Sequence, residues 1–296
     1  AGCSPKEHEQ TFRAILKRAG LNPFLLQVAN IREQCAWVVH EREAATQKAR
    51  ALLRGAIKRV SRHEPLEIKT IDCCADVLVV GSGVAGISAA LAVARKDRKV
   101  YLIEKEPCIG GRVARHEDLY PDMVCASCLI ESQLDAVLHH DHIEVLTLTE
   151  LLEVKGYLGN FVASVRQKAR YVDPEACIGC SACFEACPVS VPGSFIGGMT
   201  GRKAIHIPYP GALPNVALMD EETCLRFQGE PCCACLESCP FGAIRYEEAD
   251  EIRELKVGAV VVATGFVPFD PLKDDRYGYG KAENILTSLE FEQLVN

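Results

Sequence analysis

The chain has 296 residues and a mass of 32.4 kDa, which is enough for about two domains. Its apolar content of 48% excludes an intrinsically disordered chain, and its net charge of −7 argues against general nucleic-acid binding. No apolar run is long enough for a membrane span, and no secretory signal is visible in the opening residues. Together with 16 cysteines, this predicts a reducing, cytoplasmic setting of the anaerobic type.

Residues 1–72 are predicted to form a helical N-terminal segment. Apolar residues recur at helical spacing in 11–18 and again in 45–62, and we expect Asn22-Pro23 to restart a helix after Gly20. The segment holds 13 Lys and Arg against 8 Asp and Glu, so its net charge is +5 and the remainder carries −12. It is either a solvated helical face or an arm that docks on an acidic partner or on the chain's own acidic body.

An α/β domain is predicted after this segment. Residues 76–80 form a short continuous apolar run, typical of a buried strand in a parallel sheet, and 81–96 and 99–103 read as a helix and a second strand. The later elements are expected at 125–140 (helix), 142–147 (strand), 155–160 (hairpin), 253–257 and 258–263 (strands). The simplest organisation is one FAD/NAD(P)-binding domain, formed by 73–170 and 247–296, with a module inserted at 171–246 in a hairpin loop.

Gly81-x-Gly83-x-x-Gly86 is a dinucleotide-binding pattern in the required context, between a strand and a helix. Gly81 permits the tight turn, Gly83 lets the backbone approach a pyrophosphate, and Gly86 lets the helix pack on the sheet. The helix N-terminus favours the phosphates. Glu104, at the end of the second strand, is expected to accept hydrogen bonds from ribose hydroxyls, which favours FAD or NAD over NADP.

Two later elements favour FAD over NAD. Gly110-Gly111-Arg112 follows the second strand, where two-dinucleotide flavoproteins place glycines near the pyrophosphate and the flavin, and Ala263-Thr264-Gly265 ends a late strand. Arg112 either pairs with a phosphate, lies near the flavin, or is an ordinary surface residue. The predicted FAD-binding residues are Gly81, Gly83, Gly86, Glu104, Lys105, Gly110, Gly111, Arg112, Ala263, Thr264 and Gly265.

Nine cysteines between residues 177 and 239 carry the strongest signal. The run C-x2-C-x2-C-x3-C-P at 177–188 is the bacterial ferredoxin pattern, in which the fourth cysteine ligates the other cluster of a pair. The last three cysteines of a second copy keep the spacing and end in Cys239-Pro240. We therefore predict two [4Fe–4S] clusters, one on Cys177, Cys180, Cys183 and Cys239, the other on Cys187, Cys224, Cys232 and Cys235. Cys233 is the alternative to Cys232, and a zinc site is the alternative metal.

Seven cysteines lie outside these sets: Cys3, Cys35, Cys73, Cys74, Cys108, Cys125 and Cys128. Cys125-x-x-Cys128 precedes a predicted helix and could be a redox dithiol, part of a third cluster site, or a pair of structural thiols. The other five receive no assignment from the sequence.

The segments GCSPKEHEQTF, NIREQCAW, GSGVAG, EKEPCIGGR, CASC, YLGNF and RYVDPEACIGCSACFEACPV, in this order, resemble the HdrA-like family, the flavin and iron–sulfur subunits of heterodisulfide reductase. The resemblance implies a thioredoxin-reductase-like FAD domain, an inserted two-cluster ferredoxin, and a soluble multi-subunit complex with a hydrogenase-linked or NADH-linked module. Members of that family normally begin before GCSP and continue well past residue 296. The chain, which starts at Ala1, is therefore expected to be an excerpt or a split subunit.

These expectations combine into a flavin and iron–sulfur oxidoreductase subunit whose activity depends on its partners. The resemblance implies flavin-based electron bifurcation, in which one two-electron donor is split between a low-potential and a high-potential acceptor. The alternatives are a non-bifurcating flavoprotein reductase and an iron–sulfur wire with a partial flavin site, as in a class II benzoyl-coenzyme A reductase type of complex.

Overall fold

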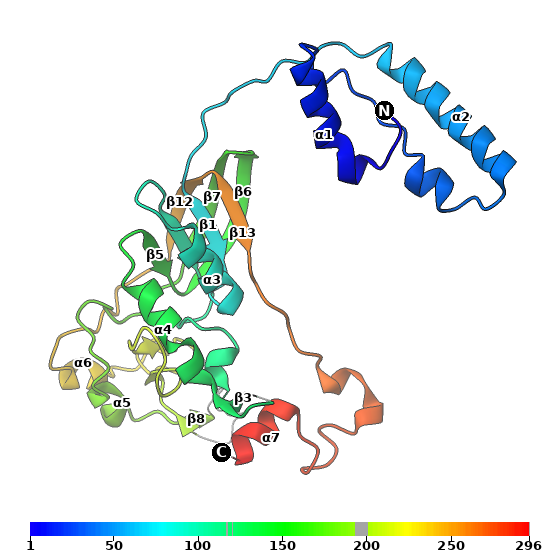
Figure 1. Ribbon diagram of the computed structural model, residues 1–296. Helices are drawn as coiled ribbons and strands as arrows, with labels where there is room; N and C mark the ends of the chain where they lie inside the picture. The colour runs from blue at the N-terminus through cyan, green and yellow to red at the C-terminus, as the bar shows by residue number, and fades with distance from the viewer. Residues whose placement is uncertain (117, 120, 193–200, 296) are drawn as a thin grey trace. The chain divides into compact units, whose positions relative to one another are not determined.

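The computed structural model describes residues 1–116, 118–119, 121–192 and 201–295 (Figure 1). The chain divides into two compact units, Ala1–Ile71 and Asp72–Asn296.

The first unit is helical, as the sequence predicts, with one correction. It contains α1 (Pro5–Arg18), the π-helix η1 (Arg32–Ala36) and α2 (Arg42–Val60). The expected restart of a helix at Asn22-Pro23 is wrong: the Asn22 Oδ1 accepts a hydrogen bond from the Phe24 N–H at 2.9 Å, which closes a local turn instead of capping a helix. Within residues 1–71, neither α1 nor α2 contains a buried residue.

The second unit is built on a four-stranded parallel sheet. Its strand order is β13-β1-β2-β5, and every neighbouring pair is in parallel register. The expected strand–helix–strand unit is confirmed, because α3 connects β1 to β2 and α4 lies between β2 and β5. The bounds are β1 (Val77–Val80), α3 (Val84–Val93), β2 (Val100–Ile103), α4 (Ala126–Leu138), β5 (Ile143–Leu146) and β13 (Ala259–Val262).

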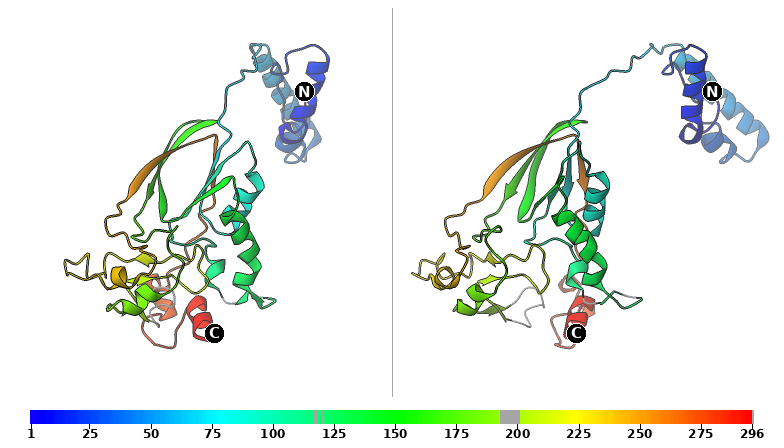
Figure 2. Two further views of the ribbon diagram at one scale, coloured as in Figure 1. Left: turned by 90° about the vertical axis from the view of Figure 1, so that its left-hand side faces the viewer. Right: turned by 60° about the vertical axis from the view of Figure 1, so that its left-hand side comes forward.

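A three-stranded antiparallel sheet with the order β12-β7-β6 covers the other face of the parallel sheet. Its strands are β6 (Thr149–Tyr157), β7 (Asn160–Gln167) and β12 (Glu251–Val257), and the predicted hairpin at 155–160 is the β6–β7 turn. Figure 2 shows α3 and α4 on one side of the parallel sheet and this antiparallel sheet on the other. Two apolar cores follow from this layering, one beneath the helices and one between the sheets.

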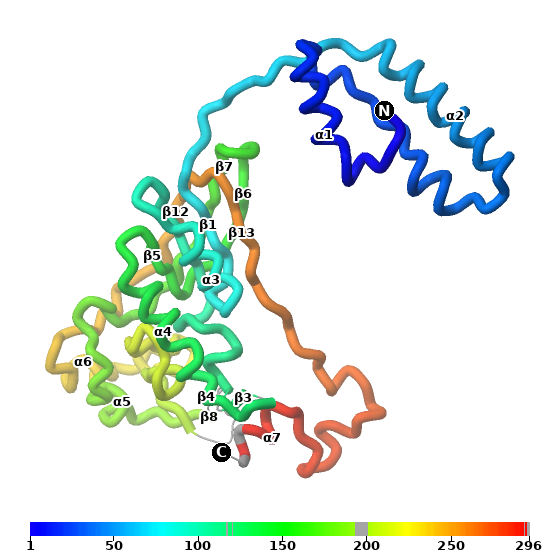
Figure 3. The backbone as a smooth tube through the Cα atoms, in the orientation of Figure 1, coloured from blue at the N-terminus to red at the C-terminus, as the bar shows by residue number. Residues whose placement is uncertain are grey.

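The cysteine-rich segment leaves and re-enters this sheet at one point. Gln167 at the end of β7 pairs with Glu251 at the start of β12, so residues 168–250 depart and return at neighbouring strands (Figure 3). The segment has its own apolar core. Its elements are α5 (Ala182–Ala186), β8 (Val191–Pro192), β9 (Gly201–Arg202), β10 (Ile205–His206), β11 (Leu218–Met219) and α6 (Ala234–Ser238). The remaining elements of the unit are η2 (Val113–Arg115), β3 (Asp118–Leu119), β4 (Val124–Cys125), η3 (Pro271–Lys273), η4 (Asp275–Tyr277) and α7 (Ser288–Val295).

Candidate cofactor sites

The three glycines of the turn between β1 and α3 differ in what surrounds them. Gly81 has a φ of +99°, and a Cβ there would lie 2.4 Å from the carbonyl oxygen of Ala263. A Cβ on Gly86 would lie 1.8 Å from the carbonyl oxygen of Gly81, so helix and turn require glycine at both positions. Gly83 is the N-cap of α3, and a Cβ there would have no atom within 4 Å. The turn is therefore tight at its base and open at Gly83, which fits the approach of a phosphate group.

The carboxylate of Glu104 is held by the turn itself. Glu104 is 8% exposed, and its Oε2 accepts hydrogen bonds from the N–H and the hydroxyl of Ser82, both at 2.8 Å. Its Oε1 accepts from the Glu106 N–H at 3.0 Å. An ionised carboxylate has about four acceptor positions, so little capacity is left for a ribose hydroxyl, and that role of Glu104 stays a prediction. No pattern in the sequence pointed to the part played by Ser82, and the neighbouring Lys105 is exposed.

The predicted Gly110-Gly111 pair closes over the glycine turn. Both residues have positive φ, +104° and +61°, which favours glycine. The Gly110 N–H donates to the carbonyl of Ser82 at 2.9 Å, and a Cβ on Gly111 would lie 2.9 Å from the Cα of Gly83. The loop after β2 and the turn after β1 therefore approach each other closely enough that a side chain on Gly111 would clash.

The third predicted element, Ala263-Thr264-Gly265, lies beside the same turn. The Ala263 N–H donates to the Val80 carbonyl at 2.8 Å, which extends the pairing of β13 with β1. The guanidinium of Arg112 donates two hydrogen bonds to the Phe266 carbonyl, at 3.2 and 3.0 Å, and lies over the Phe266 ring. The predicted FAD-binding residues are thus gathered at the carboxyl ends of β1, β2 and β13, where open parallel sheets bind ligands.

The clustered cysteines surround two separate cavities. One is lined by Cys177, Cys180, Cys183 and Cys239, and the other by Cys187, Cys224, Cys232 and Cys235. These are the same two groups of four that the spacing predicts. Cys233 lines neither cavity, and its thiol donates to the Glu237 Oε1 at 2.9 Å.

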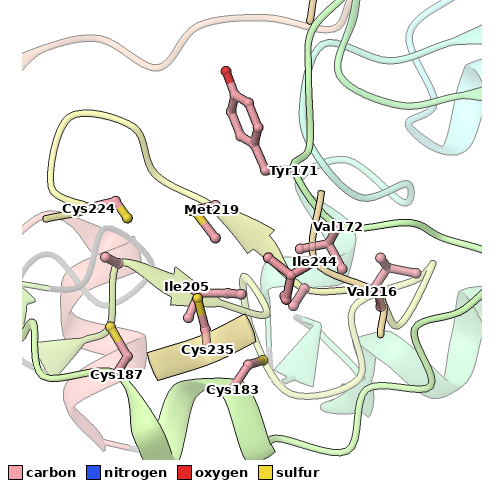
Figure 4. Close-up of a cluster of buried hydrophobic side chains, with 13 residues drawn as sticks. Tyr171, Val172, Cys183, Cys187, Ile205, Val216, Met219, Cys224, Cys235 and Ile244 are labelled. Atoms are coloured by element: carbon pink, nitrogen blue, oxygen red, sulfur yellow. The ribbon is translucent and has the colours of Figure 1, made fainter. Parts of the chain in front are cut away.

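The helices α5 and α6 place one cysteine of each group in the shared core. Cys183 on α5 and Cys235 on α6 are both buried. In Figure 4, Cys187 and Cys224 lie on one side of this core, and Val172, Val216 and Ile244 lie on the other. The interlocked assignment, in which each run of cysteines supplies a residue to the other cavity, is a consequence of this packing.

The protonation of the thiols argues for a cationic occupant. Burial and the nearby Cys177 raise the pKa of Cys183 to about 12, and burial also raises the pKa of Cys235 despite a hydrogen bond with the Tyr246 hydroxyl. Thiolates at these positions need metal to offset their charge. Among the described residues, no three His, Cys, Asp or Glu side chains converge closely enough to hold a single ion. Four cysteines spread around a cavity suit a multi-iron cluster better than tetrahedral zinc.

The other cysteines occupy three kinds of place. Cys125 is the N-cap of α4 and its Sγ accepts from the Cys128 N–H at 3.3 Å, and both thiols are on the surface. Cys108 and Cys35 are buried, Cys108 in an apolar cluster with Tyr209 and Ala212. Cys3, Cys73 and Cys74 are exposed or partly exposed, and nothing in the structure gives them a role.

Known families match both parts of this unit. The model described as "FAD dependent oxidoreductase" matches residues 76–169, and the one described as "4Fe-4S binding domain" matches residues 170–192. They confirm the predicted fold class, an α/β FAD-binding domain followed by a ferredoxin module. The match to the second model includes the first run of four cysteines only.

Curated relatives extend over the whole chain. It is 41% identical to the HdrA-type iron–sulfur subunit of the CoB–CoM heterodisulfide reductase of Methanocaldococcus jannaschii, and 44% identical to a subunit of the same name from Methanopyrus kandleri. The chain is a relative of these HdrA-type subunits. Each alignment covers 100% of this chain and 44% of the relative, so the chain spans less than half of their length.

A solved structure, the thioredoxin reductase of T. acidophilum, is 13% identical and aligns with 66% of this chain and 78% of its own, at a TM-score of 0.27. In the part of this heterodisulfide reductase relative that the structure describes, no helix is long and apolar enough to cross a membrane.

Proposed function

We propose that this chain is the FAD- and [4Fe–4S]-containing electron-transfer part of a multi-subunit oxidoreductase, acting in flavin-based electron bifurcation within a heterodisulfide-reductase-like complex. The observation that carries the proposal is the presence, in one compact unit, of a glycine turn open at Gly83 and two cavities with four cysteines each. A bound flavin exchanges electron pairs, and bound clusters exchange single electrons.

Each group of residues would hold one part of the cofactor set. The turn at Gly81 to Gly86 and the Gly110-Gly111 loop would hold the pyrophosphate of FAD, with Arg112 and the 263–265 segment at the edge of the site. The two groups of four cysteines would each hold one cluster, with Cys232 in preference to Cys233 because Cys233 faces Glu237. Cys125 and Cys128 leave open a third cluster or a dithiol.

Contacts between the inserted segment and the flavin loop support electron transfer between them. The Ile109 N–H, one residue before Gly110, donates to the Leu213 carbonyl at 2.8 Å. Cys108 packs against Tyr209 and Ala212 of the same segment. The residues 168–250 are therefore held directly against the loop that precedes the predicted flavin-binding glycines.

Domain boundaries and partners are part of the proposal. We place the FAD-binding domain at 73–170 and 247–296, with the dicluster module at 171–246 and the helical segment at 1–72. The relatives are named as subunits of CoB–CoM heterodisulfide reductases, which supports partner subunits that supply and accept electrons, in a cytoplasmic assembly. Because β13 is an edge strand of the parallel sheet and Val262, Phe266 and Val267 are more than two-thirds exposed, further polypeptide is expected to complete the flavin site.

Cofactor content of anaerobically purified protein tests the proposal. We expect about 8 Fe per chain, from two four-iron clusters, and about one FAD when the completing polypeptide is present. The same iron without any flavin would indicate an iron–sulfur wire, and zinc or a colourless protein would contradict the proposal.

Bifurcation needs a kinetic test on the intact complex. Reduction of a low-potential acceptor should stop when the high-potential acceptor is withheld, whereas a non-bifurcating reductase would continue to reduce whichever acceptor is present.

A further inference from the structure

Arg170 is a buried cation at the junction between the flavin loop and the cysteine-rich segment. It is only 6% exposed. Its Nη2 donates to the Pro107 carbonyl at 2.7 Å and to the Thr147 hydroxyl at 2.8 Å, and its Nη1 lies 3.4 Å from the Val216 carbonyl. The side chain therefore joins the loop that leads to Gly110, the end of β5, and the strand-like segment that leads into the cysteine core.

None of the described carboxylates forms an ion pair with this guanidinium, whose three acceptors are neutral oxygens. A buried positive charge without an anion is unfavourable, and arginine does not escape the cost by deprotonation. Burial lowers the pKa of Arg170, while negative charge at Cys108, Glu248 and Cys177 opposes the shift. Glu248 is engaged elsewhere, since it accepts a hydrogen bond from the Tyr171 N–H at 2.6 Å.

The two cavities stand in different relations to this charge. Val216 accepts from the guanidinium, and the next residue, Ala217, lines the cavity of Cys177, Cys180, Cys183 and Cys239. Val172, two residues after Arg170, lines the same cavity. The cavity of Cys187 is connected to Arg170 through its backbone only, because the Met219 N–H donates to the Arg170 carbonyl at 3.2 Å.

A cluster held by four thiolates gains one negative charge on reduction, and nearby charge and hydrogen bonds set its potential. We propose that Arg170 is a positioning residue that raises the reduction potential of the cluster held by Cys177, Cys180, Cys183 and Cys239 above that of the other cluster. It thereby makes the cluster beside the flavin loop the preferred first electron acceptor. This inference rests on the proposed function, because it requires both clusters to be bound.

The test is an EPR-monitored redox titration of the full chain, purified anaerobically with its clusters. In Arg170→Gln, which keeps two donors but removes the charge, one cluster should become at least tenfold harder to reduce, a shift of about 59 mV for a one-electron couple. Arg170→Lys should retain most of the wild-type potential. A Cys180→Ser variant identifies which signal belongs to the cluster in question.

Arg245→Gln is the matched control. Arg245 lies six residues after Cys239, but it is half exposed and paired with Asp173 at 3.3 Å, so loss of its solvated charge should leave both potentials unchanged. If Arg170→Gln fails to load iron, Thr147→Val carries the test, because it removes one anchor of the guanidinium and should give a smaller shift of the same sign.

The outcomes separate the two proposals. Clusters at full iron content whose potentials do not move in Arg170→Gln, or that move equally, would overturn the role of Arg170 and leave the proposed function intact. Wild-type protein without iron would contradict the proposed function instead.

Discussion

The carbonyl oxygen of Ala263 lies 2.4 Å from the position that a Cβ on Gly81 would occupy. This contact brings the end of β13 against the turn after β1, although the whole inserted segment lies between the two residues in the chain. The base of the predicted FAD site is therefore formed by two distant segments, and it cannot accept a side chain larger than hydrogen at this point.

The glycine turn allows folding and cofactor binding to be separated. Gly83→Ala should keep the fold, because its φ of −71° suits any residue and no atom lies within 4 Å of the new Cβ. It should raise the Kd for FAD at least tenfold, about 1.4 kcal/mol, because the methyl group occupies the space needed by the phosphates. Flavin titration of the reconstituted protein measures this, and unchanged affinity would place the phosphates elsewhere.

Gly86→Ala serves as the contrasting variant. Its Cβ would lie 1.8 Å from the Gly81 carbonyl, so the helix must shift from the sheet. We expect a loss of about 3 kcal/mol in the free energy of unfolding, at the upper end of the cost of overpacking, measured by denaturant titration.

Cys232 and Cys233 should differ sharply although they are adjacent. Cys232→Ser should lose one cluster and about four iron atoms, because Cys232 lines the cavity shared with Cys187 and Cys224. Cys233→Ser should keep about 8 Fe, since the Cys233 thiol is hydrogen-bonded to Glu237 outside both cavities. Iron analysis of the two purified variants decides between them, and the reverse pattern would show that the cysteines exchange places when the cluster assembles.

The Cys125–Cys128 pair is expected to react asymmetrically. A hydrogen bond from the Cys128 side chain holds the pKa of Cys125 below its usual value, and the same contact raises the pKa of Cys128. At about pH 7 Cys125 should therefore be alkylated first, and Cys128→Ala should slow that reaction by removing the donor. The difference should vanish well above pH 9, where Cys125 is ionised with or without the hydrogen bond. Protection of both thiols until iron is removed would instead support a third cluster.

Glu150 should contribute a pH-dependent term to stability. Hydrogen bonds from Lys168 and Arg166 hold the pKa of Glu150 at about 2, against 4.5 for the free side chain. Because the folded-state pKa is depressed, the contribution is complete above pH 4.5 and is lost as the pH falls towards 2. The carboxylate is one-third exposed, so Glu150→Gln should cost only about 0.5 kcal/mol near neutral pH.

Urea denaturation of wild type and Glu150→Gln at several pH values measures this term. The difference between the two proteins should narrow below pH 4.5. A constant difference would mean that the pairing across β6 and β7 acts through packing and not through charge.

The local features of this protein were readable from the sequence. The strand, glycine turn and helix at 77–93 and the two cysteine runs depend on covalent spacing, so residue type and interval suffice to predict them. The helix expected at Asn22 failed for a local reason as well, because the asparagine side chain bonded to the backbone two residues ahead.

The tertiary structure decided what distant segments do to each other. Ser82 occupies the Glu104 carboxylate, Glu237 draws Cys233 away from its neighbour, and the fold buries Arg170 between three segments. Each of these depends on side chains that packing brings together, and neither composition nor spacing records which polar group loses its water when the chain closes.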